Sequence, residues 1–205
     1  LAMQRHLQLG SYRTAWPMSH KIRKALHNRG DAYRPSGIVE LDGAAFGSSR
    51  AENQREVLVA IESRTYFDSR RQTRPKAGFV KVTVAPGTTQ AAQAFADAAL
   101  DPTTLINTDG GHALRAIENF DTEFRVMNGK KKSLEAWLPH VFWFLENAKT
   151  WIAGTFHGVK ARYLGQYLAG YTYRFNRRHD LNGMFHRALR ACVLASRITQ
   201  KMLCA

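Results

Sequence analysis

Short apolar runs separated by turn residues fill the middle of the chain and predict β-strands there. The five predicted strands cover residues 38–41, 56–62, 78–84, 105–108 and 124–127. The stretch between the second and third runs, residues 63–77, is rich in Arg and Lys, and we interpret it as a basic hairpin loop.

Helical periodicity dominates both ends of the chain and also appears between the later strands. The predicted helices cover residues 90–100, 112–117, 134–152, 160–174 and 181–202. We expect Gly154 to end the long helix 134–152. Residues 1–35 are basic and read as two helices, with Gly10 ending the first and Ser11 capping the second. This segment resembles a helix-turn-helix, and a plain helical hairpin is the alternative.

The order of the elements is three strands, a helix, and then alternating strands and helices, which predicts an α/β fold. We expect an RNase H-like mixed sheet flanked by helices and preceded by the small helical segment. The expected domain boundaries are residues 1–35, 36–178 and 179–205, the last being a basic helix.

Charge narrows the classes of partner. The 205 residues include 30 Lys and Arg against 16 Asp and Glu, a formal net charge of +14, which favours nucleic acid. A basic surface without such a role is the alternative. The two cysteines lack metal-ligand spacing, and neither a secretory signal nor a membrane-spanning apolar stretch is visible. These features predict a cytoplasmic protein.

Asp42 and Asp109 each stand where a predicted strand gives way to glycine. A carboxylate at the end of a buried strand is costly unless it is paired or binds a cation, although Asp-Gly is also a common turn pair. If the two strands are neighbours in one sheet, the carboxylates converge in the way that proteins hold magnesium for phosphoryl transfer.

A third metal ligand is expected from the polar face of helix 134–152, which offers Glu146 and Asn147. Glu146 is the better magnesium ligand by charge, but it can instead pair with Lys149 one turn later. Asn147 offers a neutral carbonyl oxygen. The residues alone leave both possibilities open.

Two further stretches suit contact with nucleic acid. His157 stands in a GTFHG turn that is plausible for phosphate contact, and residues 171–178 interleave aromatic residues with Arg. A packing or surface role for His157 and a solvated helix end for residues 171–178 are the alternatives. The histidines show no zinc-binding pattern.

A series of short motifs gives the chain a likeness to a known family. The motifs are LQLGSYRTAW at 7–16, HKIRKA at 20–25, VELD at 39–42, TDG at 108–110, NAKTW at 147–151, GTFHGV at 154–159 and YRFNRR at 173–178. In this order, over roughly residues 4–195, they resemble the ISXO-like insertion-sequence transposases of the DDE superfamily.

The resemblance implies an RNase H-like fold, two divalent ions (Mg²⁺ or Mn²⁺), and cutting and joining of double-stranded DNA at insertion-sequence ends and target. It carries the first two acidic positions to Asp42 and Asp109 and the third to Asn147, with Lys149 as its basic partner. Glu146 stays an unresolved neighbour. The DNA-contacting residues implied are Lys21, Arg23, His157, Arg174, Asn176, Arg177 and Arg178.

The resemblance also implies a homodimer on DNA in the bacterial cytoplasm, associated with the nucleoid. Segment 1–35 would bind DNA and segment 36–178 would be catalytic. Family members usually begin with a zinc ribbon, which would lie upstream of Leu1, so we expect a fragment of a longer protein.

Three stretches depart from the family pattern. Gly43 replaces a second acid, Ala169 and Gly170 replace an acidic pair, and residues 118–133 match poorly. These departures support an alternative in which the protein is a catalytically inactive DNA-binding derivative of a transposase. A nuclease related by fold only is a third hypothesis.

Overall fold

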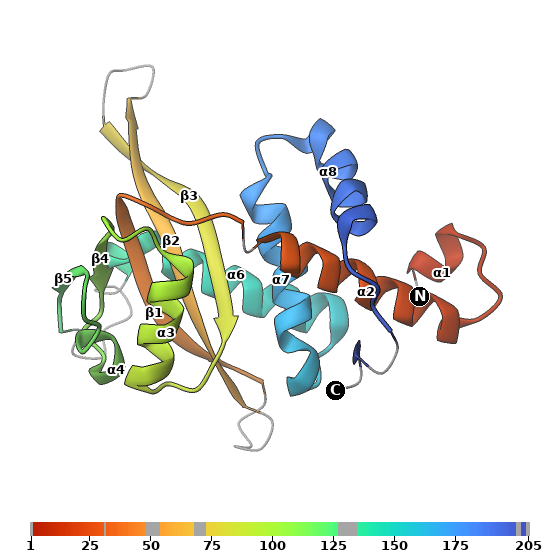
Figure 1. The fold of residues 1–205 in the computed structure, drawn as a ribbon, viewed down its shortest axis with the longest axis horizontal. Coiled ribbons are helices and arrows are strands. Elements are labelled where there is room, and N and C mark those ends of the chain that lie inside the picture. Colours follow the sequence, from red (N-terminus) through yellow and green to blue (C-terminus); the bar gives the residue numbers. More distant parts are fainter. Residues whose placement is uncertain are drawn as a thin grey trace. The chain divides into compact units, whose positions relative to one another are not determined.

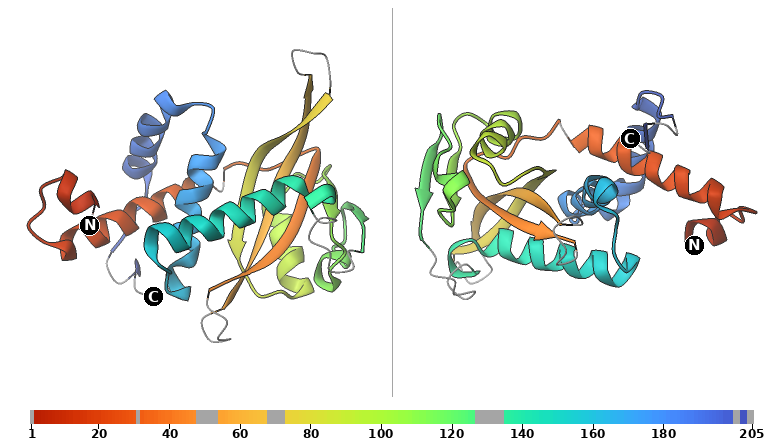
Figure 2. Two further views of the ribbon diagram at one scale, coloured as in Figure 1. Left: turned by 180° about the vertical axis from the view of Figure 1, so that it is seen from behind. Right: turned by 90° about the horizontal axis from the view of Figure 1, so that it is seen from below.

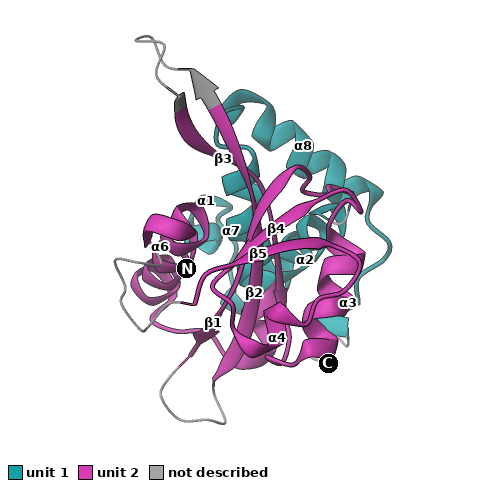
Figure 3. Cartoon of the chain, turned by 90° about the vertical axis from the view of Figure 1, so that its left-hand side faces the viewer, with its two compact units in different colours: residues 1–32, 166–205 teal, residues 33–165 magenta. Residues whose placement is uncertain are grey.

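The computed structural model describes residues 2–30, 32–47, 54–67, 73–126, 135–199 and 202–203. The chain divides into two compact units (Figure 3). The sheet unit is Tyr33–Gly165, and the helical unit combines Leu1–Ala32 with Gln166–Ala205. Sequence analysis expected boundaries after residues 35 and 178, whereas the second division falls at Gln166.

A five-stranded mixed sheet forms the centre of the sheet unit (Figure 1). Its strands are β1 (Ile38–Phe46), β2 (Arg55–Phe67), β3 (Thr73–Val84), β4 (Leu105–Thr108) and β5 (Asp121–Phe124). The order across the sheet is β3-β2-β1-β4-β5. The first three strands pair antiparallel, while β4 runs parallel to β1 and β5 parallel to β4. The predicted α/β, RNase H-like fold class is confirmed.

Helices cover both faces of this sheet (Figure 2). On one face, α3 (Thr89–Ala99) and α4 (His112–Arg115) share a hydrophobic core with Val39, Leu41 and Ile106. On the other face, α6 (Pro139–Phe156) crosses β1 and β2. Because side chains alternate along a strand, Glu40 and Asp42 lie on the α6 face of β1.

The predicted hairpin loop 63–77 is wrong. Strand β2 continues to Phe67 and β3 already begins at Thr73, so most of this stretch is paired strand. Since β3 lies at the edge of the sheet, its charged side chains can reach water without breaking the strand, and edge strands commonly carry such charges.

Three element ends also differ from the sequence prediction. Strand β5 covers Asp121–Phe124 rather than 124–127. Helix α6 passes Gly154 and stops at His157, whose left-handed backbone (φ 52°) is a common helix ending. The last helix ends at Leu194, where Ala195 turns to an extended backbone.

The helical unit contains α1 (Ala2–His6), α2 (Tyr12–Gly30), most of α7 (Leu164–Asn176) and α8 (Leu181–Leu194), and the 3₁₀ turn Ala161–Tyr163 precedes α7. The Arg13 backbone N–H donates to Ser11 Oγ at 3.1 Å, so the predicted cap of α2 is confirmed. Leu26, Tyr173 and Ala191 form a small core, and the Tyr173 hydroxyl donates to the Met184 carbonyl at 2.7 Å.

Candidate functional site

The strands that carry the two predicted metal ligands are neighbours. Strand β1 runs parallel to β4, with Glu40 opposite Asn107. Two residues further along the chain from each come Asp42 and Asp109, so the register places them opposite each other. Asp109 follows the end of β4, whereas β1 continues past Asp42 to Phe46, so the predicted end of the first strand at Asp42 is wrong. Asp42 is buried (6% exposed) and Asp109 is half-buried.

The electrostatics of Asp42 show that the two carboxylates interact. Burial, and after it the negative charge of Asp109, raise the pKa of Asp42 to about 7. The Gly43 N–H, which donates to Asp42 Oδ1 at 2.7 Å, and the positive charge of Lys149 act in the opposite direction. Two like charges held together are an arrangement that a divalent cation would relieve.

The turn after β4 fixes the position of Asp109. Gly110 adopts a left-handed backbone (φ 76°), and Asp109 Oδ1 accepts the Gly111 N–H at 2.8 Å. The indole N–H of Trp137 donates to the Thr108 carbonyl at 2.8 Å and holds the end of the strand. A Cβ at Gly110 would lie 3.0 Å from Arg115 Nε, so this position needs glycine for space as well as for conformation.

Glu40 attaches α6 to the sheet, and sequence analysis assigned it no role. Its Oε2 accepts the backbone N–H groups of His140 and Val141 at 2.8 and 2.9 Å. The first N–H groups of a helix lack partners within the helix, and the residue before α6, Leu138, makes no side-chain cap. Burial raises the pKa of Glu40 to about 7, while these N–H groups and the Ser63 hydroxyl lower it. The only sequence signal is a Glu between two buried positions of a strand.

Lys149 is the residue of α6 whose charge acts on Asp42. Its Nζ lies 3.8 Å from Glu146 Oε1 and 5.8 Å from the centre of the Phe46 ring. The predicted alternative role of Glu146, an ion pair with Lys149, is therefore present, and the two residues share one edge of the helix.

Asn147 lies elsewhere on α6. It is exposed, and two residues of helix turn the side chain through about 200°, which places Asn147 about 160° around the helix from Lys149. The structure therefore does not bring Asn147 and Lys149 to the same edge. In the described part of the chain, no three His, Cys, Asp or Glu side chains gather closely enough to hold a metal ion.

Gly43, one of the departures from the family pattern, faces away from Asp42. A Cβ there would lie 3.3 Å from Leu58 Cδ2, in the core shared with α3. An acid at this position would point to the opposite face of β1. Its absence removes no oxygen from the Asp42 side of the sheet.

The predicted DNA-contacting residues fall into both units. His157 belongs to the sheet unit, where it is exposed at the end of α6. In the helical unit, Lys21 and Arg174 are exposed, while Arg23 places its guanidinium 4.1 Å from the Tyr167 ring centre. Burial lowers the pKa of Arg23.

The aromatic and basic run near the end of α7 packs on itself. The guanidinium of Arg177 lies 3.9 Å from the Tyr173 ring centre and is 8% exposed, while Asn176 is half-buried. The guanidinium of Arg178 lies 4.1 Å from the Phe175 ring centre, and its N–H donates to the Phe175 carbonyl at 2.7 Å. The interleaved pattern thus produces internal stacking, and Arg177 is not at the surface.

The sequence profile of the ISXO2-like transposase domain matches residues 35–176, well over half of the chain. The matched span contains Asp42, Asp109, Asn147 and Lys149. No curated protein compared with the chain matches it. None of the helices in the described ranges is long and apolar enough to cross a membrane.

Proposed function

The chain belongs to the family of ISXO2-like transposase domains, and from this premise we propose that it cuts and joins DNA at the ends of an insertion sequence. One observation carries the proposal: Asp42, in the middle of β1, and Asp109, directly after β4, lie at matching positions of two parallel neighbouring strands, and the charge of Asp109 raises the pKa of Asp42. The proposed partners are transposon-end and target duplexes in the bacterial cytoplasm, with two copies of the chain acting together.

Asp42 and Asp109 would supply two carboxylates to a divalent metal. Among the described residues Glu146 does not gather with this pair closely enough to hold a metal, although it lies on the Lys149 edge of α6, while the family resemblance points to Asn147. We propose that Glu146 joins the pair when a metal binds. When bound, Mg²⁺ or Mn²⁺ supplies activation of the attacking oxygen and stabilisation of the leaving oxygen. The burial of Asp42 limits competition from water for its carboxylate, and Lys149 provides a positive charge for a DNA phosphate beside the pair.

The test is metal-dependent nicking of a transposon-end duplex by the intact natural chain. We expect Asp109→Ala to reduce nicking roughly a thousandfold or more, because a metal ligand contributes several kcal/mol to the transition state, while DNA binding persists. Asp97→Ala is the matched control, since it removes an exposed carboxylate on α3. Equal nicking by Asp109→Ala and the control would overturn the proposal.

A second function, DNA binding without cutting, is favoured by Phe142. This residue precedes Lys149 by seven positions, about two helical turns, and so shares its edge of α6. Glu40 meets α6 at Val141 and Phe46 meets it at Lys149, so the part of α6 over Asp42 includes a buried phenyl ring. Absence of nicking by the wild-type chain, with binding intact, supports this second function, and nicking without strand joining would indicate a nuclease.

A further inference from the structure

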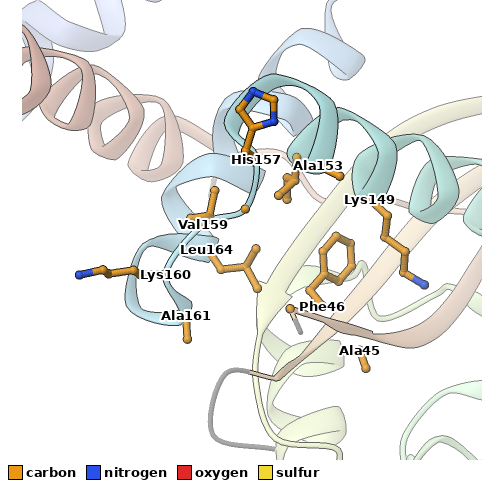
Figure 4. A pocket seen from close by; sticks show the side chains of 12 residues that line it. Ala45, Phe46, Lys149, Ala153, His157, Val159, Lys160, Ala161 and Leu164 are labelled. Carbon is orange, nitrogen blue, oxygen red and sulfur yellow. The ribbon is translucent and has the colours of Figure 1, made fainter. Parts of the chain in front are cut away.

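A pocket of about 820 Å³ opens at the end of β1 that follows Asp42, entirely within the sheet unit. It lies between the end of β1, the last turns of α6 and the segment that leads into α7 (Figure 4). Pockets of 300–1,000 Å³ accommodate small organic ligands, so this one is large enough for a nucleotide.

The interior of the pocket is apolar and its rim is basic. Phe46, Ile152 and Leu164 supply apolar surface, and Figure 4 shows Phe46 and Leu164 extending into the shared space. The amino groups of Lys149 and Lys160 point away from that space in opposite directions. The lining therefore fits a ligand with a flat apolar part inside and anionic groups outside.

Lys149 links the pocket to Asp42. Its Nζ lies 5.8 Å from the centre of the Phe46 ring, and its charge lowers the pKa of Asp42. Asp42 and Phe46 lie on the same face of β1, four residues or about 13 Å apart. A DNA strand held at Asp42 and Asp109 would therefore reach the pocket along this same face of the sheet.

We propose that this pocket receives an unpaired nucleobase of the bound DNA against the apolar wall formed by Phe46, Ile152 and Leu164, while the phosphates on either side pass Lys149 and Lys160. The proposal rests on the proposed function and deepens it by naming the substrate feature that the site recognises. An apolar wall beside cations suits an unpaired base, because every base has a flat, largely apolar face and every linkage has a phosphate.

The test compares the binding of the intact chain to a blunt duplex with its binding to the same duplex carrying a two-nucleotide 3′ or 5′ overhang. Binding is followed by fluorescence anisotropy without divalent ions. We expect one overhang to bind roughly tenfold more tightly than the blunt end. Ala153→Trp and Ala161→Trp fill the pocket from its wall and should abolish this preference. Thr155→Trp, exposed on the same helix outside the pocket, should keep it.

Any of four results would overturn the proposal. The first is equal affinity of the wild-type chain for all three duplexes, and the second is a preference that survives in both Trp variants at the pocket. The third is that an overhang with abasic sites binds as tightly as the same overhang with its bases, which would assign the overhang preference to the phosphates alone. If Ala153→Trp instead converts a dimer to a monomer by light scattering, the pocket holds a second copy and the proposal fails.

The experiments distinguish failure of the proposal about the pocket from failure of the proposed catalytic function. Overhang binding is measured without divalent ions and does not depend on cutting. Nicking without an overhang preference refutes only the pocket, and a preference without nicking refutes only the catalytic role.

Discussion

Glu40 and Asp42 are buried carboxylates on the same face of β1, and their surroundings differ. Burial raises the pKa of each to about 7. Glu40 faces donors, namely the His140 and Val141 N–H groups and the Ser63 hydroxyl, all of which favour its charged form. Asp42 faces the negative charge of Asp109, which disfavours its charged form.

The difference separates a structural role from a functional one. A buried acid with donors on two elements holds those elements together, as Glu40 does for β1 and α6. A buried acid beside a like charge costs the fold free energy, and such an arrangement is typical of sites that bind a cation or carry out chemistry. The comparison predicts that removing the carboxylate lowers stability at Glu40 and leaves it unchanged or raised at Asp42.

The largest expected effect on stability is at Glu40. We expect Glu40→Ala to lower the free energy of unfolding by about 3 kcal/mol, because it leaves the first N–H groups of α6 buried without an acceptor. Asp42→Asn should be neutral or stabilising at pH 8, since it removes a buried charge beside Asp109. Urea unfolding of both variants provides the measurement, with Glu123→Ala on the exposed edge strand β5 as control. Equal losses at the two positions would refute the distinction.

The next largest effect concerns the third residue that would bind a metal together with Asp42 and Asp109. We expect Glu146→Gln to weaken Mg²⁺ affinity about tenfold, because Glu146 shares the Lys149 edge of α6 and loses its charge. Asn147→Ala should change the affinity less than about twofold, since Asn147 lies about 160° away around the helix.

The measurement is the rise in melting temperature with Mg²⁺ concentration, which reports binding to the folded state. Lys160→Gln controls for the loss of a charged side chain that points away from the pocket. A larger effect at Asn147 than at Glu146 would restore the ligand implied by the family resemblance and would require α6 to rotate when metal binds.

A structural feature could be predicted from the sequence where it depends on residues close together along the chain. The strand runs before Asp42 and Asp109 are local, and the predicted fold class makes their strands neighbours. The orientation of α6 is not local, because apolar residues such as Val141, Phe142 and Phe144 surround much of the helix and leave no unique buried face.

Contacts that the sequence pattern does not reveal account for the other differences. The role of Glu40 depends on N–H groups a hundred positions away in the sequence. The alternation of Arg with aromatic residues predicted DNA contact for Arg177, and in the structure this residue stacks on Tyr173 one turn back. Charge in residues 63–77 suggested a loop, but β3 is an edge strand that tolerates it.

The smallest expected effect is the contribution of Asp109 to the pH dependence of stability. Because the pKa of Asp42 is about 7 in the folded chain and 3.8 is its ordinary value, the folded state binds more protons than the unfolded state between these values. Stability therefore falls as pH rises from about 4 to about 7, and Glu40 contributes in the same direction.

Asp109→Asn removes the like charge beside Asp42 but leaves its burial. We therefore expect this variant to gain about 1 kcal/mol at pH 8 and almost nothing at pH 4, where Asp42 is already protonated. Melting temperatures at the two pH values in EDTA measure the gain, and Asp97→Asn on α3 serves as the control for removing an exposed carboxylate. A gain of the same size at both pH values would mean that the charge of Asp109 does not raise the pKa of Asp42. The electrostatic argument for a shared cation site would then fail.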